Sequence, residues 1–209
     1  PRVEVGFPEV QLGLIPAWGG STLLPRLIGL GPALEWITSA TRHDAATAVR
    51  AGWADRLVPR DQVLATAVRL IRADAATDEH LRLRAARRAP LALSTDAIEL
   101  SRLAALAHLR PAPAAALEAP TAAAHLLCDT AALDQTASLQ AESRCLAERL
   151  QSPVVGALLN VFQLRQRSTQ TSSPQTSSPQ ASSRPTSDQR TTPEAPPALD
   201  HVGVIGAGI

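Results

Sequence analysis

GFPEVQLGLIPAWGGSTLLPRLIG, residues 6–29, is the stretch that decides the fold of this chain. It places one acid, Glu9, among apolar residues, and residues 6–16 carry too many Gly and Pro for regular structure. Two adjacent glycines then permit a tight turn, after which Ser21 offers a hydroxyl that can cap the first free amides of a helix. We expect that helix to run to about Ile28, because the glycine that follows is a common helix stop.

Capping and turn residues after this stretch predict a succession of short elements. Pro32 suits the first position of a second helix, and Asp44 is expected to cap a third helix that ends at Gly52. Residues 54–58 are followed by a proline and predict a short strand. Residues 61–72 place apolar side chains at helical spacing and so predict an amphipathic helix.

Residues 91–165 are overwhelmingly helical in composition. Pro120 lies inside one of the segments. An interior proline removes a hydrogen bond at a cost of about 3 kcal/mol, so we expect a kink or a break there. Residues 133–150 and 154–164 continue the helical region, and a Ser-Pro pair supplies the cap and first position of the latter segment.

The spacing of several residues within 6–29 is specific. These residues are Pro8-Glu9, Leu12-Gly13, Pro16, Gly19-Gly20, Leu24, Arg26 and Gly29. In this arrangement the segment resembles the crotonase (enoyl-CoA hydratase/isomerase) family, whose comparable stretch has the form GxPEvxLGlxPGxGGTxrLxRxxG. The order of segments along the chain is most similar to multifunctional members that join an enoyl-CoA hydratase to a 3-hydroxyacyl-CoA dehydrogenase.

The resemblance implies roles for two residues. Glu9 occupies the position of the general acid/base glutamate of the hydratases, although a lone glutamate in a loop is ordinarily a solvent-facing charge. Ala17 stands where the family usually has glycine, and its amide would help to position the catalytic water. The family also needs a second glutamate and an oxyanion hole, which we expect upstream of Pro1, so the isolated chain is predicted to be inactive. Trp18 is expected either to pack against an acyl chain or a neighbouring domain, or to belong to the core.

The chain closes with VGVIGAGI, residues 202–209. The apolar run 202–205 predicts a buried parallel strand, and Gly206 and Gly208 follow at once. In a Rossmann-type NAD-binding domain the first such glycine permits a tight turn, and the second lets the pyrophosphate approach the backbone. A lone GxG is weak evidence, but its place after a strand, in this order of segments, favours NAD as cofactor. The third glycine and the ribose-binding acid are expected beyond Ile209.

These patterns predict an α/β fold class and four parts. Residues 1–72 would be the C-terminal part of a crotonase core, and 73–165 a mostly helical connecting region that opens with a solvated connector to about residue 88. Residues 166–198, rich in Ser, Thr, Gln and Pro, would be a flexible linker. Residues 199–209 would be the truncated start of the dehydrogenase's NAD-binding domain. The chain contains no Met and stops inside a motif, so we expect an internal fragment.

The composition argues against several classes of function. The net charge is +1 with arginines interspersed among acids, which argues against a nucleic-acid binder. No apolar run approaches the roughly 18 to 20 residues needed to cross a bilayer. Cys128 and Cys145 have no CxxC spacing and no histidine beside them at ligand spacing, so we expect buried thiols in a reducing, cytoplasmic setting and no metal site.

The sequence therefore predicts part of a bifunctional β-oxidation enzyme. With a coenzyme A thioester as substrate, it would hydrate 2-enoyl-CoA and oxidise 3-hydroxyacyl-CoA with NAD, in an oligomer for which a thiolase subunit is a candidate partner. Two alternatives stay open. A crotonase relative that isomerises the double bond can need only one glutamate. A non-catalytic assembly module would use the helices of residues 91–165 to dock subunits.

Overall fold

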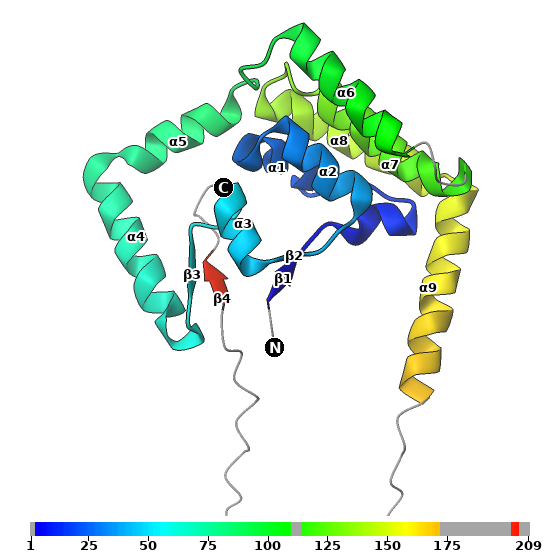
Figure 1. Ribbon diagram of the computed structural model, residues 1–209, viewed down its shortest axis with the longest axis horizontal. Helices are drawn as coiled ribbons and strands as arrows, with labels where there is room; N and C mark the ends of the chain where they lie inside the picture. The colour runs from blue at the N-terminus through cyan, green and yellow to red at the C-terminus, as the bar shows by residue number, and fades with distance from the viewer. Residues whose placement is uncertain (1–2, 110–113, 172–201, 205–209) are drawn as a thin grey trace, which may run out of the picture.

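The computed structural model describes residues 3–109, 114–171 and 202–204. The helices span Gly20–Ile28 (α1), Leu30–Ser39 (α2), Ala45–Ala51 (α3), Val63–Thr77 (α4), Glu79–Arg88 (α5), Thr95–Leu109 (α6), Ala114–Asp129 (α7), Gln135–Leu150 (α8) and Pro153–Thr171 (α9). The strands are Glu4–Val5 (β1), His43–Asp44 (β2), Arg56–Val58 (β3) and Val202–Val204 (β4), and 3-10 turns cover Pro8–Leu12 (η1) and Arg60–Gln62 (η2). Helices α6, α7 and α8 form a layer over α1 and α2, while α4 and α5 extend on one side and α9 on the other (Figure 1).

The hydrophobic core lies where α1, α2 and α7 meet. Leu24, Ile37 and Leu127 supply one large apolar side chain from each of these helices, and none is more than 2% exposed. Burying such a side chain contributes about 1.5–3 kcal/mol. Ala123 and Ala124 of α7 are fully buried, and their small side chains let α7 pack closely against its neighbours.

Several boundaries follow the sequence prediction because their signals are local. Helix α1 ends at Gly29, which has φ +88°. Helix α3 is capped by Asp44, whose Oδ1 accepts a hydrogen bond from the Thr47 amide at 2.7 Å, and it ends at Gly52 with φ +84°. Helix α2 differs, since Pro32 is its third residue and the helix begins two positions earlier than predicted.

Residues 73–88 are mostly exposed, as predicted for a solvated connector, and they form helices although their charges show no clear period. Helix α4 continues to Thr77 and α5 covers Glu79–Arg88, with Asp78 in a left-handed conformation between them. Ala, Leu, Arg and Glu are strong helix formers, so propensity favours helices here without a regular apolar stripe. Helix α5 then packs against α1 and α8.

The helical region departs from prediction at two points. Helix α7 runs through Pro120 without a break, because packing of its buried face against α2 and α6 offsets the hydrogen bond that proline removes. Helix α9 begins at Pro153 as predicted but continues to Thr171, past the predicted start of the linker at residue 166. Residues 172–198 of that linker lie outside the described residues.

The last strand pairs differently from the prediction. β4 runs antiparallel to β3, with Arg56 opposite Val204, whereas the Rossmann interpretation required a parallel strand. A short strand pairs with a free edge that lies beside it, and β3 offers such an edge. Gly206 and Gly208 lie outside the described residues. The predicted α/β class is thus met only in part, since helices dominate and each sheet among the described residues has two strands.

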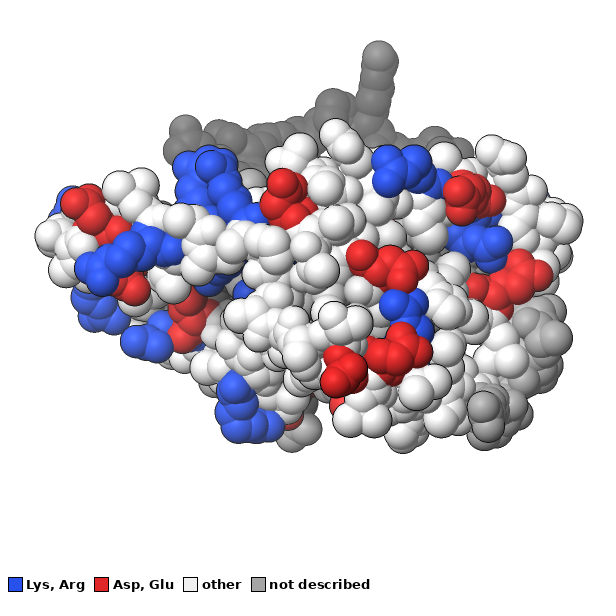
Figure 2. Space-filling view, turned by 90° about the horizontal axis from the view of Figure 1, so that it is seen from above, with Lys and Arg blue, Asp and Glu red and all other residues white. Residues whose placement is uncertain are grey.

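Charges of both signs are mixed on the face seen in Figure 2, where acidic side chains lie among the arginines. Arg102 illustrates the pattern, because it pairs with Glu99 at 3.0 Å and with Asp129 at 2.8 Å. Within the part of the chain that the structure describes, no helix combines the length and apolar character needed to span a membrane.

Candidate active site

The turn that leads into α1 holds an unusual backbone. Trp18 has φ +54° and Gly19 has φ +92°, and residues with a side chain rarely adopt such left-handed conformations. Gly20 is needed for another reason, since a Cβ at this position would lie 2.8 Å from the Cβ of Pro16. Glycine is therefore needed at position 19 because the backbone is left-handed there, and at position 20 because there is no room for a Cβ.

Ser21 closes this turn and does not cap the helix as predicted. Its hydroxyl donates to the carbonyl oxygen of Pro16 at 2.6 Å, and its amide donates to the same oxygen at 3.1 Å. Helix α1 begins at Gly20 with Gly19 as its cap residue, so Ser21 already lies inside the helix. A capping side chain must precede the first turn, and Gly19 has none to offer.

Capping of α1 comes instead from a distant acid, Glu142 of α8. Its Oε1 accepts the Gly19 amide at 2.7 Å, and its Oε2 accepts the Thr22 amide at 2.9 Å. Glu142 is 3% exposed and lies at the positive end of the helix dipole, where negative charge is favourable. The sequence prediction missed it. The available signal was an acid four residues after Ser138 on the buried face of α8, a place where an acid needs a partner.

Glu9 lies in η1, ahead of this turn. Its backbone is fixed, because its carbonyl oxygen accepts the Leu14 amide at 3.1 Å and Gly13, with φ +79°, ends η1. The side-chain atom Oε2 of Glu9 is buried and has no hydrogen-bond partner among the described residues. A buried polar oxygen without a partner costs folding free energy, and such groups are commonly retained where a ligand or reactant uses them.

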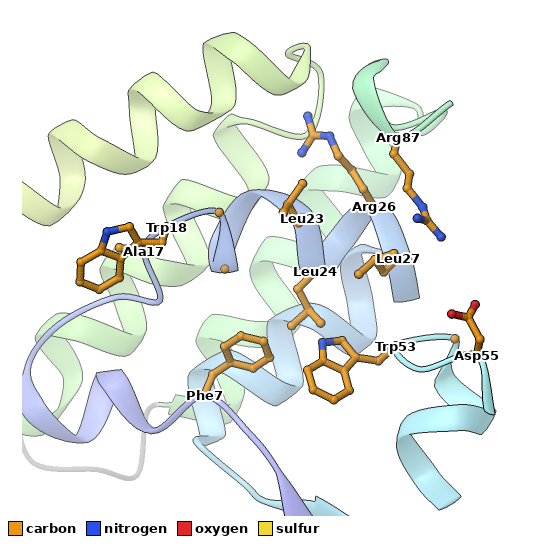
Figure 3. Close-up of a pocket in the computed structure, with 13 residues that line it drawn as sticks. Phe7, Ala17, Trp18, Leu23, Leu24, Arg26, Leu27, Trp53, Asp55 and Arg87 are labelled. Carbon is orange, nitrogen blue, oxygen red and sulfur yellow. The ribbon is translucent and has the colours of Figure 1, made fainter. Parts of the chain in front are cut away.

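A cavity of about 280 Å³ opens beside α1 (Figure 3). Ala17 and Trp18 lie at one end of it in this view and Asp55 and Arg87 at the other, with apolar side chains between them. The structure thus places Ala17 on the cavity wall. Glu9 is not one of the lining residues, although Phe7, two positions earlier, is. Trp18 is 98% exposed, which excludes the core position considered for it.

Comparison with known proteins identifies this segment. Residues 2–104 match the model of the enoyl-CoA hydratase/isomerase family. This part of the chain belongs to the crotonase family. The fatty acid oxidation complex subunit alpha of Acinetobacter baumannii strain AYE is 32% identical over 167 residues, which cover 76% of this chain and 22% of the relative. The same subunit from strain SDF is equally similar. The chain spans about a fifth of the length of these curated relatives.

Arg26 joins the crotonase segment to the helices that follow it. Its guanidinium donates to the carbonyl oxygen of Leu133 at 2.9 Å and to the Ser138 hydroxyl at 3.0 Å. Burial lowers the pKa of Arg26 below its ordinary value, and the nearby charge of Asp134 opposes that shift. Since Leu133 and Ser138 flank the first turn of α8, Arg26 provides a second link between α1 and the helix that carries Glu142.

The sequence also led to predictions about metal binding, NAD binding and the two thiols. Residues 3–109, 114–171 and 202–204 contain no group of three or more His, Cys, Asp and Glu suited to a metal ion. NAD binding stays a prediction, because Gly206 and Gly208 lie outside the described residues. Cys128 is a buried free thiol and Cys145 a partly buried one, and burial raises the pKa of both.

Proposed function

We propose that this chain contributes the C-terminal part of an enoyl-CoA hydratase site to a fatty-acid oxidation protein, with Glu9 as the group that transfers a proton. The observation that carries the proposal is the buried Oε2 of Glu9, which lies within the crotonase segment and has no hydrogen-bond partner in the described part of the chain. The relatives named as fatty acid oxidation complex subunits alpha support the pathway. Activity of the whole protein is part of this proposal, because the chain covers only 22% of those relatives.

In the proposed reaction, water adds across the double bond of a 2-enoyl-CoA. As the water oxygen bonds to the β-carbon, the second glutamate accepts the proton that the water loses, and the double-bond electrons move toward the thioester carbonyl. Glu9 then delivers its proton to the α-carbon, and the two carboxyl groups exchange protons with solvent before the next turnover. The Ala17 amide at the cavity wall would hold the attacking water in place. Donors that stabilise the thioester oxygen, and a second glutamate, are expected from other parts of the protein.

The test compares two glutamate variants in the complete gene product that contains these residues. Glu9→Gln keeps the size of the side chain and removes its titratable proton, so kcat for hydration of crotonyl-CoA should fall on the order of 10²-fold or more. Glu35→Gln changes an exposed acid of the same segment and should leave kcat unchanged. Unchanged hydration in Glu9→Gln would remove Glu9 from the mechanism, and equal losses in both variants would indicate misfolding.

The same assay separates the proposed activity from the isomerase alternative. A protein that shifts the double bond of a 3-enoyl-CoA but does not hydrate crotonyl-CoA would be an isomerase, because isomerisation can proceed with a single glutamate. The 209-residue chain alone is expected to show neither activity, because the oxyanion donors and the second glutamate are expected from other parts of the protein. Oxidation of 3-hydroxyacyl-CoA with NAD and association with a thiolase subunit belong to the same proposal and are measured on the same gene product.

A further inference from the structure

We propose that Glu142 is a positioning residue for the hydration site, through which the helical region fixes the turn that presents the Ala17 amide. This inference rests on the proposed function, because the orientation of Ala17 matters to catalysis only if a reacting water binds there. Glu142 lies on α8, outside residues 2–104 that match the family model. The inference therefore assigns a part of the site to a region predicted only to connect or to dock.

The hydrogen bonds of the turn connect Glu142 to Ala17 in two steps. The carboxylate holds the amides of Gly19 and Thr22, at 2.7 Å and 2.9 Å, and so fixes the backbone on both sides of Gly20. The Gly20 amide in turn donates to the carbonyl oxygen of Ala17 at 3.1 Å. The Ala17 amide belongs to the same peptide group as the Pro16 carbonyl, whose oxygen accepts the Ser21 amide and hydroxyl. Ser21 lies between the two amides that Glu142 holds, so a displacement of this first turn of α1 would change the direction of the peptide group that carries the Ala17 amide.

The turn needs this support because its backbone is strained. Trp18 is a bulky residue in a left-handed conformation, and its side chain is 98% exposed, so little packing holds it there. Neither local side chain can cap the helix, since Gly19 has none and the Ser21 hydroxyl donates to Pro16. Glu142 is the side chain that accepts from the first amides of α1 among the described residues.

The first test measures amide hydrogen exchange in the 209-residue chain. Glu142→Gln keeps the shape of the side chain but loses its charge and one acceptor oxygen. The Gly19 and Thr22 amides should then exchange about tenfold faster or more. The Gly52 amide, which bonds to Val49 at the end of α3, should be unaffected. An equal increase in exchange rate at Gly52 would show that Glu142 only stabilises the fold as a whole. An unchanged exchange rate at Gly19 would show that Glu142 does not protect this amide. Either result would overturn the proposal.

The second test measures hydration of crotonyl-CoA by the complete gene product. Glu142→Gln should lower kcat about tenfold with KM changed less than about twofold, because the lost interaction orients water without binding the thioester. Glu148→Gln, an exposed acid on the same helix, is the matched control and should leave both constants unchanged. Loss of activity in Glu9→Gln with full kcat in Glu142→Gln would overturn the inference and leave the proposed function standing. A gene product that hydrates no 2-enoyl-CoA would refute both the proposed function and the inference about Glu142.

Discussion

Removal of Glu142 should destabilise the protein by an amount that the structure allows us to estimate. Glu142→Ala deletes two hydrogen bonds to a charged acceptor, at 2.7 Å and 2.9 Å, and each such bond contributes about 1.5–3 kcal/mol. Water entering the vacated space can satisfy part of the loss, so we expect the lower end, about 3 kcal/mol. For a chain of this size that corresponds to a fall in the melting temperature of about 6–12 °C.

Thermal and denaturant unfolding of the 209-residue chain, followed by circular dichroism, measures this effect. Glu142→Gln retains one acceptor oxygen and should lie between the wild type and Glu142→Ala. Glu148→Ala, at an exposed position of the same helix, should change the free energy of unfolding by less than about 0.5 kcal/mol. A loss below about 1 kcal/mol for Glu142→Ala would refute the reasoning, because the two amides would then have found other partners at little cost.

Two further predictions concern the turn and the thiols. Gly20→Ala should destabilise the chain by about 1–3 kcal/mol in denaturant unfolding, because the added Cβ meets Pro16 at 2.8 Å; an unchanged midpoint would show that the turn can relax. Burial raises the pKa of Cys128 and Cys145, so the unfolded chain loses these protons first and the free energy of unfolding should fall as the pH rises above the ordinary thiol value of 9.0. The chain contains neither Tyr nor Lys, so a variant with both cysteines replaced by alanine should lose most of this alkaline dependence.

Features encoded within a few residues were predictable from the sequence. Gly29 and Gly52 end their helices and Asp44 caps one, because these residue types meet a local backbone requirement wherever they stand. The spacing of the motif around Glu9 likewise indicated the crotonase family, which the match of residues 2–104 confirms. The exposed character of residues 73–88 was predicted, whereas the bounds of their helices were not, because the charges show no clear period and helix propensity alone is sufficient there.

Contacts between distant segments were decided by the tertiary structure alone. The sequence placed one acid, Glu9, at the site, but only the folded chain leaves its Oε2 buried without a partner among the described residues. The sequence indicated Ser21 as the residue that caps α1. In the folded chain the cap is Glu142, which lies 123 positions after Gly19 in the sequence. Every residue except proline carries the same backbone amide, so the sequence does not indicate which distant acid will accept its hydrogen bond. Only the packing of α8 against α1 decides that partner.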